Sequence, residues 1–195
     1  MKFDEFFKQK GHEILIFLLD RDYNYLLAEL LESIHVICRC TFEYPEELLK
    51  VIPKICDPTN MNVEEEKEIM LRIKILSHFS YNLKSIDFFK DSKLFELIDT
   101  MMKSSFVEKL IPDSCVLLAN ISKDDNIMKG FMEQDSLKKI ILYSLRSDLS
   151  LKKTVIRLIA NITSHDYFKQ TLLTKMLTFT IISFLLINLI LWKVW

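Results

Sequence analysis

Glycine is scarce in this chain: two of the 195 residues are Gly and four are Pro, whereas average usage of about 7% would supply roughly fourteen glycines. Glycine-rich phosphate loops need backbone amides close to a ligand, and tight hairpins need residues at positive φ. The scarcity therefore argues against a Rossmann fold, a P-loop and a turn-rich β sandwich. It favours a chain that is mostly helical.

An excess of charge of either sign is also missing, since 26 Lys and Arg face 27 Asp and Glu. Affinity for nucleic acid depends on clustered Lys and Arg that neutralise phosphates. No basic block is present, so we do not expect nucleic acid as a partner. Half of the residues are hydrophobic and 27% are charged, which predicts one globular unit with a sizeable core.

Motifs of catalytic and metal chemistry are missing as well. The chain has no GxSxG motif, and the second His of a zinc-protease helix does not follow His12 and Glu13. His35, Cys38 and Cys40 lack a second pair at ligand spacing. We therefore expect no enzymatic activity, no cofactor, no metal and no small-molecule substrate. Four cysteines are expected to be free thiols in a reducing compartment: Cys38, Cys40, Cys56 and Cys115.

The chain has one long run without charge, MLTFTIISFLLINLILW over residues 176–192. At 1.5 Å per residue a helix of this length is just long enough to cross the hydrocarbon core. The alternative is a buried terminal helix, but a core helix normally keeps a polar stripe. We expect residues 175–195 to form a transmembrane anchor after a helical domain of residues 1–174. Lysines snorkel and tryptophans suit the interface, so the expected anchor residues are Lys175, Trp192, Lys193 and Trp195.

A hydrophobic anchor at the C-terminal end predicts a tail-anchored topology. The apolar stretch ILIFLL at residues 14–19 is too short, and its flanks too acidic, for a signal peptide. Insertion would then follow synthesis and leave residues 1–174 in the cytosol. The endoplasmic reticulum and the mitochondrial outer membrane both accept such anchors, and we expect one of these two membranes. A cytoplasmic location is the alternative.

A sequence motif recurs with a period of about 42 residues. LLANIS at 117–122 returns as LIANIT at 158–163, with earlier counterparts ILSHFS at 75–80 and SIHVIC at 33–38. Such a period is typical of solenoids, and the flanking segments predict a short helix, a middle helix and a longer third helix in each unit. In every copy two apolar residues three apart share one helical face: Ile34 and Ile37, Leu76 and Phe79, Leu118 and Ile121, Ile159 and Ile162.

The recurring motif resembles the third-helix signature of the armadillo repeat, and the resemblance extends over residues 11–174. It implies an all-α fold, a right-handed α-solenoid of about four armadillo-like three-helix units followed by the C-terminal hydrophobic helix. Two features depart from the family. Asp91-Ser92 and Asp135-Ser136 stand where the family usually has Gly, and Pro112 is expected to interrupt the third unit. A HEAT-like or irregular solenoid is therefore the alternative.

The resemblance also implies a binding groove lined by the third helices, where the signature Asn hydrogen-bonds the backbone of an extended peptide. An amide suits this task because it both donates and accepts. Cations one turn earlier would favour an acidic partner segment. The alternative role for each Asn is to cap the end of its own helix. The expected partner-binding residues are Asn120, Asn161, His78, Lys74 and Arg157.

Together these expectations describe a non-enzymatic scaffold or adaptor. An armadillo-like solenoid would bind a protein or peptide on the cytosolic face of an intracellular membrane. The alternative is a truncated isoform of a larger soluble armadillo scaffold, of the cytoskeletal, ciliary or transport kind, in which the hydrophobic tail is incidental.

Overall fold

A computed structural model describes residues 3–21, 26–41, 44–59, 61, 65–90, 92–132, 135–144 and 149–166. All regular secondary structure in these ranges is helical, which confirms the all-α fold class. The expected anchor, residues 175–195 with Lys175, Trp192, Lys193 and Trp195, lies outside the described residues. Within the described ranges, no helix combines the length and the hydropathy needed to span a membrane.

The helices of the described ranges follow one another in four groups of three. The first two groups are α1 (Phe3–Lys8), α2 (Gly11–Asp20) and α3 (Leu27–Cys40), then α4 (Glu46–Leu49), α5 (Ile52–Cys56) and α6 (Glu66–Phe79). The last two are α7 (Ser85–Lys90), α8 (Leu94–Met101) and α9 (Val107–Ile121), then α10 (Asp125–Met132), α11 (Asp135–Ser144) and α12 (Leu149–Ser164). In each group the third helix is the longest, as the sequence predicts.

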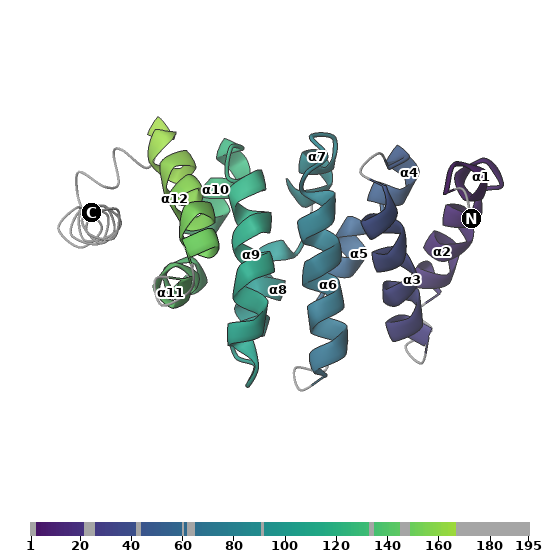
Figure 1. The fold of residues 1–195 in the computed structure, drawn as a ribbon, viewed down its shortest axis with the longest axis horizontal. Coiled ribbons are helices and arrows are strands. Elements are labelled where there is room, and N and C mark those ends of the chain that lie inside the picture. The colour runs from purple at the N-terminus through teal and green to yellow at the C-terminus, as the bar shows by residue number, and fades with distance from the viewer. Residues whose placement is uncertain are drawn as a thin grey trace.

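The four third helices stand side by side in chain order, with α3, α6, α9 and α12 forming one row (Figure 1). Each contacts the next one along the chain, while α5 packs on α6 and α11 packs on α9. Helices α1 and α12 lie at opposite ends of the row (Figure 1). His35, Lys74, Asn120 and Asn161 on these four helices are half-buried, so part of each helix in the row is accessible to solvent.

The apolar pairs of the recurring motif lie in the core, as their shared helical face predicts. Seven of the eight residues are at most 5% exposed, and Ile159 is half-buried against the core. Full burial of a side chain of this size contributes about 1.5–3 kcal/mol. The apolar residues that recur about every 42 positions therefore belong to the buried side of the third helices.

Pro112 does not interrupt the third unit, contrary to the expectation from sequence. It lies on the exposed side of α9, which continues on both sides of it from Val107 to Ile121. Proline removes one backbone hydrogen bond from a helix. Buried neighbours on the opposite side, among them Ile111 and Cys115, hold the helix in place and outweigh that local cost.

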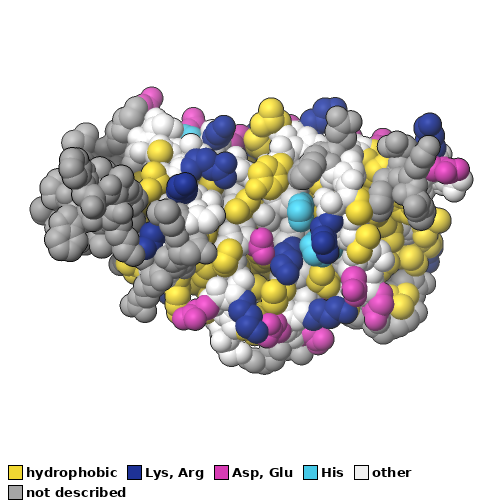
Figure 2. All heavy atoms as spheres, viewed as in Figure 1, with side chains coloured by type: hydrophobic (Ala, Val, Ile, Leu, Met, Phe, Trp, Pro, Cys, Tyr) yellow, Lys and Arg dark blue, Asp and Glu magenta, His cyan; other side chains and the backbone are white. Residues whose placement is uncertain are grey.

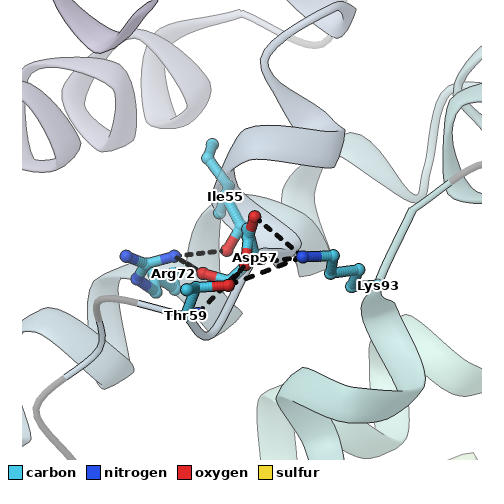
Figure 3. A network of polar contacts seen from close by, with 5 residues as sticks. All are labelled: Ile55, Asp57, Thr59, Arg72 and Lys93. Carbon is cyan, nitrogen blue, oxygen red and sulfur yellow. Dashed lines mark hydrogen bonds and ion pairs between the residues drawn. The ribbon is translucent and has the colours of Figure 1, made fainter. Parts of the chain in front are cut away.

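A buried arginine holds the connection between α5 and α6, the polar turn that begins at Asp57 (Figure 3). Arg72 is 4% exposed, and its Nη1 donates to the carbonyl oxygens of Ile55 and Asp57 at 2.8 and 3.0 Å. Its Nε donates to Glu68 at 2.9 Å. Lys93 of the next unit reaches the Asp57 carboxylate at 3.2 Å. Because α5 is only five residues long, these bonds supply order that helix length does not.

Candidate partner-binding face

The expected partner-binding residues all lie on the row of third helices. We call the surface formed by His35, Lys74, His78, Asn120, Arg157 and Asn161 the third-helix face. Its members come from α3, α6, α9 and α12, and all are half-buried except the exposed Arg157. Figure 2 shows histidine side chains near the middle of the molecule on this side, with basic and acidic side chains beside them.

The amide of Asn120 joins three neighbouring third helices. Its Nδ2 donates to the Oγ of Ser80 at the end of α6, 2.8 Å away. Its Oδ1 accepts a hydrogen bond from the Nη2 of Arg157 on α12, at 2.9 Å. Asn120 and Arg157, which the sequence places on different units, are therefore direct partners.

The amide of Asn161 makes the corresponding contact one unit later. Its Nδ2 donates to the Oγ of Ser122 at 3.0 Å and to the backbone oxygen of Ala119 at 2.9 Å. In both cases an Asn in one third helix donates to the Ser that follows the preceding third helix. We call this contact the Asn–Ser bridge.

The hydroxyl that receives the Asn–Ser bridge is itself oriented by a repeated contact. Ser80 donates to the carbonyl of Ser77 at 2.6 Å, and Ser122 donates to that of Ala119 at 3.1 Å. Thr163 occupies the same register position in the last unit, near the end of α12, and donates to the Ala160 carbonyl at 3.0 Å. The sequence signal for this contact is the Ser or Thr at the end of the segments ILSHFS, LLANIS and LIANIT. The prediction from the Asn residues alone did not include this hydroxyl.

The Asn–Ser bridges limit what the two amides offer to a ligand. Both Nδ2 hydrogens of Asn161 are in use, so its Oδ1 is the atom left to accept a bond. Asn120 keeps one N–H and one lone pair. Within the described residues both amides bond across helices rather than to the end of their own helix, so their observed contacts differ from the capping alternative.

At the register position of Asn120, the preceding unit carries His78, and no Asn–Ser bridge forms there. The centroid of the His78 ring instead lies 5.8 Å from the centroid of the His35 ring on α3. In the described part of the chain, Nδ1 of His78 is buried without a hydrogen-bond partner. The junction between α3 and α6 therefore carries a pair of imidazoles where the later junctions carry a neutral amide.

Burial and neighbouring charges set the protonation of this histidine pair. Burial lowers the pKa of His35, and His78, Lys74 and Arg39 lower it further. Burial also lowers the pKa of His78, while the carboxylate of Asp113 partly offsets this. The pKa of Asp113 is raised by its own burial, against the influence of Lys74 and His78. The pair therefore favours neutral rings in the unliganded protein.

A hollow of about 380 Å³ lies beside the histidine pair, lined by Glu66, Lys67, Met70, Leu71 and Lys74 of α6. Met70 and Leu71 supply its apolar surface. Two of the lining residues are held in ion pairs. Lys67 contacts Glu32 at 2.9 Å, and Glu66 contacts Lys109 at 2.6 Å. Lys74 belongs both to this hollow and to the surroundings of His35.

The described ranges contain no group of three or more His, Cys, Asp or Glu side chains that could hold a metal ion. Cys38 and Cys40 are two positions apart in α3, and Cys38 is buried while Cys40 is exposed. Burial raises the pKa of the Cys38 thiol to about 12. The imidazole ring of His35 contacts the ring of His78.

No family model, curated protein or solved structure matches this chain.

Proposed function

We propose that the chain is a non-enzymatic scaffold that binds a protein or extended peptide on its third-helix face. In this proposal the four helix triplets form an armadillo-like right-handed α-solenoid. The observation that carries it is the row of four third helices, which presents half-buried polar side chains from every unit along one continuous surface. Surfaces of this kind are what solenoids use for extended partners.

The third-helix face offers partial hydrogen-bonding capacity and an excess of cations. One N–H and one lone pair of Asn120 and the Oδ1 of Asn161 are left for a peptide backbone. Lys74 and Arg157 add positive charge at two separate units. An extended segment with acidic side chains is the partner chemistry that this pattern favours.

Photo-crosslinking tests the binding surface. A photo-reactive amino acid placed at Arg157 should capture a partner in cells, because this exposed position lies on the third-helix face. The same amino acid at Lys139, exposed on α11, serves as the control and should capture none. Equal capture at both positions, or capture only at Lys139, would contradict the proposal.

We further propose that residues 175–195 anchor the scaffold to the endoplasmic reticulum or the mitochondrial outer membrane, with the helical domain in the cytosol. This part of the proposal is supported by the uncharged run and its flanking Lys and Trp residues. The test is alkaline carbonate extraction of the full chain from cells. Release of the full chain into the supernatant, as expected for a variant without residues 175–195, would contradict the anchor.

The outer face of α12 favours a second candidate, a truncated isoform of a larger soluble armadillo scaffold in which the hydrophobic tail is incidental. Ile156 is 39% exposed and Ala160 is exposed, whereas Cys115 and Ala119 at the same positions of α9 are at most 1% exposed. Those positions of α9 are covered by the last unit. A transcript that encodes further repeats after residue 166 would favour this candidate over the anchored form.

A further inference from the structure

The histidine pair lies where the repeated Asn–Ser bridge is interrupted. Nδ1 of His78 is buried and has no hydrogen-bond partner among the described residues. Both rings are half-buried, so they keep an edge toward solvent. Imidazole nitrogens that are held in place but unpaired can bind a ligand without first breaking a contact in the protein.

Charges from three helices surround the histidine pair. Arg39 and Glu32 come from α3, Lys74 from α6, and Asp113 from α9. Lys67 already pairs with Glu32. Because Lys67 neutralises Glu32, the unpaired charges beside neutral rings are the cations Arg39 and Lys74 and the carboxylate of Asp113. Protonation of both rings would raise the number of cations from two to four. The surroundings therefore favour an anionic ligand.

The hollow lies next to this anion-favouring cluster on the same helix. Leu71 lines the hollow and is seven residues before His78, which corresponds to about 10 Å along α6. A chain in the extended polyproline II conformation advances about 3.1 Å per residue and returns to the same face every third residue. A bound segment that spans both places along α6 would therefore carry its anionic side chain about three positions from its apolar side chain.

We propose that α6 binds an extended protein segment whose carboxylate side chain contacts His35, His78 and Lys74 while an apolar side chain three residues away fills the hollow over Met70 and Leu71. This inference rests on the proposed function, because it requires the third-helix face to be the binding surface. It adds the chemical class of the partner and the unit of the row that recognises it.

Binding of a carboxylate at this place is coupled to pH. The ligand stabilises protonated imidazoles, whereas burial lowers the pKa of both histidines in the free protein. Protons are therefore taken up on binding, and affinity rises as pH falls through neutrality, by up to about tenfold per pH unit for each proton taken up. Arg39, Lys74, Glu32 and Asp113 are the other charged groups at the site, and a shift in Asp113 ionisation acts in the same direction.

Fluorescence anisotropy with three pools of labelled octapeptides tests the inference on the full chain in mild detergent. The first pool has Leu and Glu three residues apart in either order, with uncharged residues elsewhere. The second replaces Glu by Gln, and the third replaces Leu by Ala. We expect both replacement pools to bind at least about tenfold more weakly at pH 6, and only the Glu pools to lose affinity between pH 6 and pH 7.5.

Matched variants locate the binding. Lys74→Met should weaken the Leu–Glu pool about tenfold, whereas Lys139→Met on α11 should leave it unchanged. His78→Asn places the residue of the later units at this position and should remove most of the pH dependence. Thermal unfolding followed by circular dichroism verifies that each variant is folded.

Three results would overturn the inference. They are equal binding of the Glu and Gln pools, Lys74→Met binding as tightly as Lys139→Met, or no binding by any pool. If peptide binding is weakened by Arg157→Ala but not by Lys74→Met or His78→Asn, the inference fails while the proposed function stands. The photo-crosslinking result at Arg157 decides the proposed function separately.

Discussion

Asn120 on α9 donates a hydrogen bond from Nδ2 to the Oγ of Ser80 at the end of α6, 2.8 Å away. Asn161 repeats the contact with Ser122 one unit later. The signature Asn therefore has a structural partner in the preceding unit, and any contact with a ligand uses what the Asn–Ser bridge leaves free. This geometry leads to measurable differences between individual side chains.

Removal of one Asn–Ser bridge should destabilise the protein. Asn161→Ala removes the donor to the Ser122 hydroxyl and one of the two side-chain donors to the Ala119 carbonyl, so we expect the free energy of unfolding to fall by about 1–2 kcal/mol. Urea unfolding followed by far-UV circular dichroism measures the change. Asn126→Ala, at an exposed position in α10, is the control and should stay within about 0.5 kcal/mol of the parent. An equally small effect of Asn161→Ala would argue against a structural role for the bridge.

Loss of the Arg72 guanidinium should be among the most damaging single changes in the described part of the chain. Arg72→Met removes the donors to Ile55 and Asp57 and leaves Glu68 buried without its partner. We expect a loss of about 3–5 kcal/mol. Lys67→Met breaks an exposed ion pair with Glu32 and should cost at most about 1 kcal/mol. Similar losses for the two variants would contradict the assignment of Arg72 as a buried anchor.

A double variant separates the two parts of the Arg72 effect. Adding Glu68→Leu to Arg72→Met removes the buried charge that the single change leaves unpaired. Part of the lost stability should return, because an apolar pair costs no desolvation of charge. The carbonyls of Ile55 and Asp57 still lack a donor, so the recovery should be incomplete. A double variant no more stable than Arg72→Met would show that the carbonyl contacts dominate.

Asp57 should make stability depend on pH in the acid range. Bonds from the hydroxyl and backbone amide of Thr59, together with Lys93, lower the pKa of Asp57 to about 2 in the folded protein. The unfolded value is about 3.9, so the stabilisation is present above about pH 4 and is lost as pH falls through 2. Comparison of the protein with Asp57→Asn by thermal unfolding between pH 6 and pH 2 should show a difference that shrinks with acidification. Glu96→Gln, exposed on α8, controls for the general effect of removing a negative charge.

Among the four cysteines, Cys40 should react first with an alkylating agent in the native protein. It is exposed, whereas burial raises the pKa of Cys38 and Cys56 to about 12 and that of Cys115 to about 11. The thiolate is the reactive form, so iodoacetamide at pH 8 should label the other three only after denaturation. Peptide mapping by mass spectrometry gives the order of labelling. Labelling of Cys115 as fast as Cys40 would contradict the buried position, and Cys40→Ser should abolish the fast phase.

The succession of helices followed from the amino-acid sequence alone. Scarce glycine, apolar residues spaced by three and the 42-residue register predicted an all-helical chain with a long third helix in each unit, and Ile34, Leu76 and Leu118 are buried as that register requires. These features depend on neighbours within one or two helical turns, where periodicity is a direct consequence of helix geometry. The membrane anchor predicted from the hydrophobic tail concerns residues outside the described ranges and stays a prediction.

Tertiary structure alone decided the partners of the polar side chains. The sequence marked Asn120 and Asn161 as ligand contacts, but the position of Ser80 and Ser122 relative to them depends on how one third helix lies against the next. The buried contacts of Arg72 and the pairing of His35 with His78 were likewise missed. Hydrogen bonds between residues about forty positions apart depend on the fit of two helices to within a fraction of an ångström. Local spacing in a sequence does not carry that distance, because it is fixed only when the whole row is packed.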